Sequence, residues 1–186
     1  MEFKDILAEY IINLYQDVPG YLYKGLLSAF LLGVVLLLVF LGIKKGLRYS
    51  FKLLFVEYLL LIYSSTVLFR PFNEDKGYNF QPFWSYTAYK DGMYDLIADN
   101  IMNTIMFVPL GLLLGCAFRN VKWWQALLIG CIFSLSIESL QFVLKRGFSE
   151  TDDVIHNTLG CIVGYGMYSL TRFGYEKLSK RTVAVL

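Results

Sequence analysis

The sequence predicts an all-α membrane protein, a polytopic helix bundle with about five transmembrane helices preceded by an N-terminal amphipathic helix. Of its 186 residues, 56% are hydrophobic, and the mean hydropathy is +0.51. A soluble domain of this length is far less apolar. Apolar runs of about 20 residues, the length that crosses a bilayer as a helix, also recur along the chain. We therefore expect lipid to surround most of the protein.

The spans follow from the position of each apolar run. Residues 1–24 are expected at the membrane surface, because apolar side chains recur there at helical spacing with acidic residues between them. Five apolar runs are long enough to cross the membrane: 25–43, 53–69, 97–118, 124–144 and 153–172. No internal repeat separates them, so residues 1–186 are predicted to form a single membrane domain whose helix bundle covers 25–172.

Residues 70–96 differ in composition from the spans. They are rich in Asn, Asp, Tyr and Pro, and we expect a loop of the outer face. A loop this long in a small protein is more often functional or packed on the helix ends than idle. Residues 173–186 are expected to be a cytoplasmic tail.

Lysine and arginine predict the orientation. One side of the predicted bundle holds ten of the 17 Lys and Arg residues, around 44–52, 119–122 and 172–181. Most of the acidic residues fall on the other side. Because cytoplasmic loops are enriched in Lys and Arg, we expect the N-terminus outside and the C-terminus in the cytoplasm.

Polar side chains inside a membrane are costly, so their positions are the best indication of function. Ser134, Glu138 and Gln141 recur on one face of the fourth predicted span. Glu138 is the acidic residue that lies well within a span and away from the basic clusters. With the predicted topology, further polar residues reach the same outer region: Arg70, Asn79, Asn103, Arg146, Asp152, Asp153 and Asn157.

Two interpretations of these residues remain. They form either a hydrogen-bonded clasp that fixes helix packing, with Glu138 paired to Arg146 or Arg70, or a ligand or catalytic site. A clasp needs one or two polar residues, whereas about eight converge here, so a site is favoured. Packing of the third and fifth spans is predicted to use small residues instead, Gly111 with Gly115 and Gly160 with Gly164.

Cysteine and histidine usage argues against a structural metal. Cys116, Cys131 and Cys161 lie in apolar runs, without a CxxC pair, and His156 is the only histidine. We predict no zinc or disulfide framework and no metal site. The expected partners are the lipid bilayer and an envelope ligand, not nucleic acid, and the sequence leaves the oligomeric state open.

Four segments carry a family resemblance. They are RPF at 70–72 ahead of NFQPF at 79–83, NTIMFVPLG at 103–111, SLSIESLQ at 134–141, and RGFSETDDVIHNTLGCIVGY at 146–165. In this order and spacing they resemble the VanZ-like family, over about half the chain. The resemblance implies a multi-pass protein of the bacterial plasma membrane, and the namesake of the family is associated with low-level resistance to the glycopeptide teicoplanin. It implies no settled activity.

Three functions are open at this point. The first is a non-catalytic protein that binds teicoplanin-like lipoglycopeptides or a lipid-linked wall precursor through Arg70, Asn79, Asn103, Gln141, Arg146, Asp152 and Asn157. The second is an intramembrane enzyme in which Glu138 and Asp153 supply acid–base groups, or ligands to a divalent cation such as Mg²⁺, for a lipid-phosphate substrate. No recognised nucleophile motif accompanies these residues. The third, a transporter, ranks lowest because no inverted repeat is present.

Overall fold

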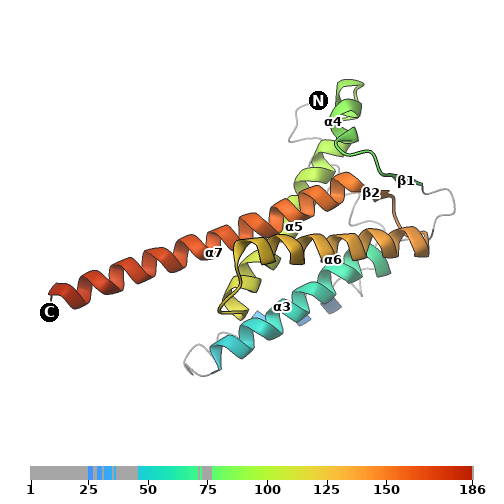
Figure 1. Ribbon diagram of the computed structural model, residues 1–186. Coiled ribbons are helices and arrows are strands. Elements are labelled where there is room, and N and C mark those ends of the chain that lie inside the picture. The colour runs from blue at the N-terminus through green and yellow to red at the C-terminus, as the bar shows by residue number, and fades with distance from the viewer. Residues whose placement is uncertain are drawn as a thin grey trace.

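The computed structural model describes residues 46–70, 72 and 77–185, together with residues 25, 26, 29, 30, 32–34 and 36. The amphipathic segment expected at 1–24 lies outside the described residues, and so does most of the first expected span, 25–43. Helices make up nearly all of the described part, as Figure 1 shows. The predicted all-α helix bundle is confirmed.

Four long helices form most of the bundle over residues 46–185. Helix α3, Leu47–Tyr63, continues into a single π-helical segment, η1, Ser64–Leu68. Helix α5 covers Asp95–Ala117, α6 covers Trp123–Leu144 and α7 covers Thr151–Val185. Three short elements lie between them: strand β1 at Tyr78–Asn79, helix α4 at Trp84–Lys90 and strand β2 at Ser149–Glu150.

Three helices of the described part are long and apolar enough to cross a membrane: Arg48–Leu68, Asp95–Ala117 and Trp123–Leu144. They correspond to the second, third and fourth expected spans. The fifth, expected at 153–172, falls within α7, which is not among the three. Helix α7 also runs unbroken to Val185, so residues 173–185, expected in the cytoplasmic tail, are helical. The total of five spans stays a prediction.

The segment 70–96 contains more regular structure than the predicted loop. Strand β1 and the seven-residue helix α4 both lie within it. Sequence composition could not indicate either element, because each is held by residues that lie some 70 positions later, on β2 and at the start of α7.

Glycines let α5 and α7 pack with their backbones in contact. A Cβ added to Gly160 would overlap the carbonyl oxygen of Thr104, and one added to Gly164 would overlap that of Val108. From the other side, a Cβ at Gly111 would overlap the carbonyl oxygen of Cys161. The predicted small-residue seam is therefore confirmed as the contact between these two helices.

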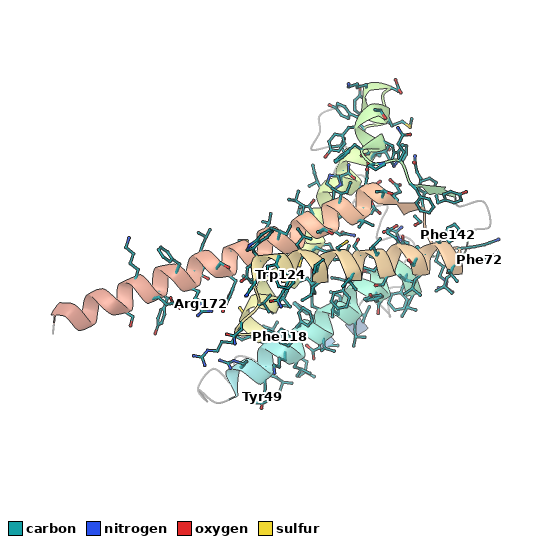
Figure 2. All side chains as sticks on the ribbon, viewed as in Figure 1. Tyr49, Phe72, Phe118, Trp124, Phe142 and Arg172 are labelled. Carbon is teal, nitrogen blue, oxygen red and sulfur yellow. The ribbon has the colours of Figure 1, made fainter. Side chains whose placement is uncertain are left out.

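The bundle has a small apolar centre and an apolar outside. Phe107, Leu110 and Ile137 are almost completely buried between the helices, whereas Leu60 and Ile132 are about 60% exposed. Large exposed apolar side chains surround the bundle, as expected for helices that face lipid. Figure 2 shows these side chains projecting outward along the long helices.

The bundle has two distinct ends. At the polar end, η1 and α6 end, α5 and α7 begin, and α4, β1 and β2 lie close by (Figure 1). At the basic end, α3 and α6 begin and α5 ends. The basic end carries these cationic residues of the described chain: Arg48, Lys52, Arg119 and Lys122.

Candidate functional site

Strand pairing brings two distant connections together at the polar end. Strands β1 and β2 are parallel, with Tyr78 opposite Ser149 and Asn79 opposite Glu150. The Asn79 side chain accepts a hydrogen bond from the backbone N–H of Gln81 at 2.9 Å. Asn79, predicted as a ligand-binding residue, therefore shapes the turn after β1 through this bond.

Asp152, at the start of α7, anchors helix α4. Its carboxylate is completely buried and accepts hydrogen bonds from the backbone N–H groups of Phe83 and Ser85, the latter at 3.0 Å, and from the Ser85 hydroxyl. A carboxylate at a helix N-terminus satisfies N–H groups that have no partner within the helix. Phe83 itself has a left-handed backbone, with φ of 62°. These bonds occupy Asp152 fully, as in a structural anchor.

Side chains on either side of Asp152 extend the same connection. The Trp84 indole donates to Glu150 Oε2 at 2.8 Å, and the Asn100 amide donates to the Ser85 hydroxyl at 2.8 Å. His156 Nδ1 lies 2.7 Å from the Asp152 carbonyl oxygen, which can only accept, so this nitrogen carries the proton. In the neutral ring, His156 Nε2, 2.9 Å from the Tyr86 hydroxyl, accepts its hydrogen bond.

Glu138 is buried, with 6% of its surface exposed, and faces the connection between α6 and α7. Its Oε2 accepts the backbone N–H of Glu150 at 2.9 Å. Glu138 does not pair with Arg146, one of the two partners that the clasp interpretation considered for it. Arg146 instead donates to the carbonyl oxygens of Leu68 and Arg70, because the end of η1 leaves carbonyls without partners within the helix.

Arg70 lies among three carboxyl groups. It interacts electrostatically with Glu138, Glu150 and Asp153. Its guanidinium also lies over Gly147, where an added Cβ would be 2.9 Å from Nη1. Within the described chain, the ion pair present is the exposed Arg172–Glu176, so Arg70 is near these carboxylates without a direct ion pair.

Two buried amides beside Glu138 are only half satisfied. Gln141 Nε2 donates to the Thr66 carbonyl oxygen at 2.9 Å, and Asn157 Nδ2 donates to the Ser134 hydroxyl at 2.9 Å. Both residues are 2% exposed. Their oxygens, Gln141 Oε1 and Asn157 Oδ1, have no hydrogen-bond partner among the described residues. Such buried acceptors are rare in native structures, because each one costs its full desolvation free energy.

Burial and nearby acids affect the protonation of Glu150. The pKa of the Glu150 carboxyl is raised from its usual 4.5 to about 7, mainly by burial and also by the nearby acids Asp99 and Asp152. The Trp84 hydrogen bond and the charge of Arg70 act in the opposite direction. Glu150 therefore changes its protonation state near neutral pH. No pattern in the sequence had marked it as a site residue.

The structure brings together most of the predicted site residues, but not Asn103. Within the described part of the chain, no hydrogen bond joins the Asn103 side chain to the polar end, and Asn100, one turn earlier, occupies that role. Both asparagines fall on the same helix face, so the sequence pattern could not separate them. Nothing in the sequence around Trp84 and Ser85 marked them as site residues, because their hydrogen-bond partners lie on α7 and β2.

Among the described residues, no group of three or more His, Cys, Asp or Glu side chains is arranged to hold a metal ion. The polar end offers hydrogen-bond acceptors, and Arg70 lies among three of its carboxyl groups. Such a set can bind O–H and N–H donors and can hold one anionic group at the guanidinium. Together, apolar helices and this polar cluster define a membrane helix-bundle protein with a candidate binding site at one end.

The family follows from the comparisons. The VanZ/LLP1 family model matches residues 29–172, so the chain belongs to the VanZ/LLP1 family. The chain is similar to Protein VanZ of Enterococcus faecium, with 35% identity over 71 residues, which are 38% of this chain and 44% of that protein. The match thus spans less than half the length of that relative. No solved structure matches the chain.

Proposed function

We propose that the protein binds a lipoglycopeptide such as teicoplanin, or a lipid-linked precursor of the cell envelope, at its polar end. The observation that carries this proposal is the pair of buried amide oxygens, Gln141 Oε1 and Asn157 Oδ1, that lack partners among the described residues. Gln141 lies one turn after Glu138 on α6 and bonds to η1, and Asn157 of α7 bonds to Ser134, one turn before Glu138. A ligand that donates hydrogen bonds would satisfy both oxygens.

The chemistry of both ligand classes fits these acceptors. Glycopeptides and wall precursors carry sugar hydroxyls and peptide N–H groups, all of which donate to amide and carboxylate oxygens. Arg70 would bind the anionic part of such a ligand, a carboxylate or a phosphate, through paired N–H groups. Its lack of a direct ion pair in the described chain leaves the guanidinium available for that contact.

The intramembrane enzyme, with Glu138 and Asp153 as acid–base groups, is the second candidate. The proximity of both carboxyls to Arg70 favours it, because that arrangement suits a lipid phosphate. Against it, Glu138 Oε2 is already engaged by the Glu150 backbone, as in a group that shapes a binding site. Release of product from a lipid-linked substrate by purified protein would support the enzyme over the binding protein.

Substitutions that neutralise a carboxylate test the site. Glu138→Gln and Asp153→Asn keep the size of each side chain but remove its negative charge. We expect both variants to insert at normal abundance and to lose at least about tenfold in affinity for the ligand, because one charged hydrogen bond contributes roughly 1.5 to 3 kcal/mol. Teicoplanin tolerance of cells and binding to purified protein would be measured. Glu176→Gln, at an exposed acid of α7, is the control.

Unchanged tolerance and binding in both variants would contradict the proposal. Loss of folded protein in both would instead indicate the structural clasp, since an uncompensated charge change in a buried cluster can unfold a marginal bundle. Arg146 is left out of these substitutions, because its hydrogen bonds to backbone carbonyls hold the chain just after α6 against the end of η1.

The proposal also requires the polar end to face outward, as the distribution of Lys and Arg predicts. In a variant whose native cysteines are replaced by alanine, Gln81→Cys would test the polar end, and Ser179→Cys would test the far part of α7. Both positions are exposed. We expect an impermeant thiol reagent to label the first and not the second in intact cells. The opposite pattern would reverse the orientation.

A further inference from the structure

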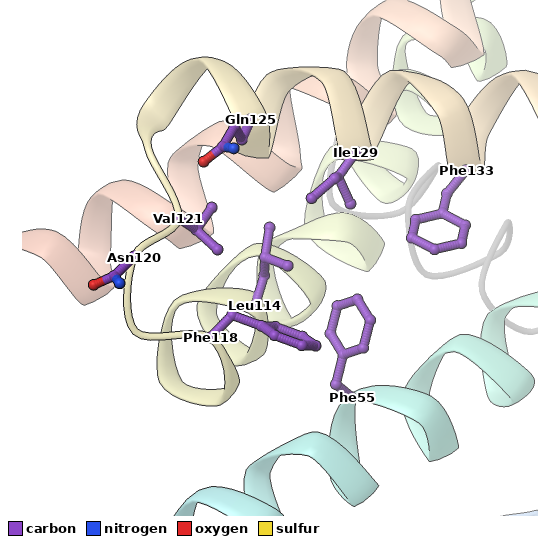
Figure 3. A pocket seen from close by; sticks show the side chains of 8 residues that line it. All are labelled: Phe55, Leu114, Phe118, Asn120, Val121, Gln125, Ile129 and Phe133. Atoms are coloured by element: carbon purple, nitrogen blue, oxygen red, sulfur yellow. The ribbon is translucent and has the colours of Figure 1, made fainter.

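A cavity lies at the basic end of the bundle, away from the polar cluster. Its volume is about 420 Å³, within the ~300–1,000 Å³ range of small-molecule sites. Phe55 of α3, Leu114 of α5 and Phe133 of α6 form its apolar wall, as Figure 3 shows. Ile129 faces it from α6, one turn before Phe133 (Figure 3). The three helices that line it are the ones that, among the described residues, are long and apolar enough to cross a membrane.

The wall of the cavity is aromatic. The ring of Phe55 packs edge-on against Phe118, with ring centroids 5.7 Å apart, and against Phe133 at 6.3 Å. Rings in these positions offer an apolar surface to a flexible hydrocarbon chain. A polar, water-soluble ligand would form few hydrogen bonds here, because few polar groups line the cavity.

The polar groups of the cavity lie at one side, in the α5–α6 connection and the first turn of α6. Asn120 and Gln125 are at this side (Figure 3). Gln125 Oε1 accepts the backbone N–H of Lys122 at 2.9 Å, which leaves the Gln125 NH₂ group to donate. Amide donors beside an apolar cavity suit the ester oxygens of a lipid.

Cations surround the same side. Lys52 Nζ lies 5.6 Å from the centroid of the Phe118 ring, and Arg119 and Lys122 are exposed on the connection that lines the cavity. Arg172 of α7 reaches the Arg119 carbonyl oxygen at 3.3 Å, so a further cation lies close. Basic residues at the end of a membrane helix bundle attract anionic lipid head groups, at about 1 kcal/mol for each Lys or Arg.

We propose that this cavity binds an anionic phospholipid of the surrounding bilayer, with one acyl chain in the apolar cavity and the phosphate group at Lys52, Arg119 and Lys122. The positive charges of Lys52, Arg119 and Lys122 favour an anionic head group, and the aromatic wall of the cavity contacts the acyl chain. The site is at the opposite end of the bundle from the ligand site proposed above and does not depend on it.

Lipid binding to the purified full chain tests this site. Native mass spectrometry would compare phosphatidylglycerol with phosphatidylcholine, added separately to the protein in detergent. We expect phosphatidylglycerol to bind more tightly. Lys52→Gln and Lys122→Gln should each weaken its binding about fivefold and leave phosphatidylcholine unchanged. Lys90→Gln and Lys145→Gln, at exposed cations of the polar end, are the controls.

A second variant separates chain binding from simple attraction to charge. Ile129→Trp should fill the cavity and weaken phosphatidylglycerol binding, whereas Ile132→Trp, at a position 61% exposed to lipid on the same helix, should not. Thermal unfolding would verify that both variants fold. Equal binding of the two lipids would overturn the proposal. So would cation variants that bind normally, or a folded Ile129→Trp variant that retains full affinity.

Discussion

Helix α7 contacts its two neighbours in opposite ways. Against α5 it uses glycines, so that Gly160 and Gly164 bring the two backbones together without a polar side chain between them. Against α6 it uses a polar pair, Asn157 with Ser134, and leaves an amide oxygen without a partner among the described residues. The first contact is typical of tight helix packing in membranes, whereas the second costs stability.

The difference indicates a division of tasks along one helix. The seam with α5 fixes where α7 lies, because neither backbone can move away without losing close contact. The contact with α6 retains groups that packing does not need. Polar atoms with no structural benefit are the ones to examine for function, since a protein keeps them at a cost to its stability.

The largest effect is expected at the glycine seam. Gly160→Leu would place a side chain where the Thr104 carbonyl lies, so α5 and α7 must separate. We expect a loss of about 3 kcal/mol or more, at the upper end of overpacking effects, and a strong fall in folded protein. Thermal unfolding in detergent would measure it. Gly166→Leu is the control, because no atom lies within 4 Å of a Cβ there. Equal stability of both variants would show that the seam is not needed.

A smaller effect is expected at the anchor of α4. Asp152→Asn replaces a carboxylate that accepts three hydrogen bonds by an amide that must turn an NH₂ group toward donors. We expect a loss of about 2 kcal/mol, since hydrogen bonds to a charged group contribute roughly 1.5 to 3 kcal/mol. Limited proteolysis within 80–95 should accelerate before the bundle unfolds. The exposed Asp91→Asn is the control, and unchanged cleavage would mean that Asp152 does not hold α4.

The smallest effect concerns pH. Because the pKa of Glu150 in the folded protein, about 7, lies above its usual 4.5, the protonated form favours folding. This contribution is complete below about pH 4.5 and is lost as pH rises through about 7. Glu150→Gln should therefore gain in melting temperature relative to the native protein between pH 5 and pH 8, by a few degrees at most. Glu176→Gln should not. If the difference in melting temperature between Glu150→Gln and the native protein stayed constant across this pH range, the raised pKa of Glu150 would be refuted.

Much of the architecture could be predicted from the sequence because lipid imposes simple rules on length and polarity. Apolar runs predicted three helices that the structure bears out, and glycine spacing predicted close packing of the third and fifth spans, which the structure shows to be against one another. The details of the polar end could not be predicted in this way. Asp152 and Glu150 bind residues about 70 positions earlier, and no local pattern encodes such a partner.

The same limit explains the error at Arg146. Arg146 was expected to bind a ligand or, in the clasp interpretation, to pair with Glu138, but its guanidinium bonds to the carbonyls at the end of η1. A π-helical segment cannot be read from apolar periodicity, so the carbonyls it leaves free were not foreseen. Polar residues thus predicted the region of the candidate site, and tertiary structure decided which of them bind one another.

The length of α7 has a mechanical consequence. Its 35 residues make a helix roughly 52 Å long at about 1.5 Å per residue, longer than the hydrocarbon core of a bilayer, which is about 30 Å thick. Its first turn holds α4 through Asp152, and the glycine seam with α5 lies further along the same helix. The seam, at Gly160 and Gly164, lies in the first half of α7, so the helix would pivot about that point. Any tilt imposed on its first turn swings the distant end, near Val185, in the opposite direction.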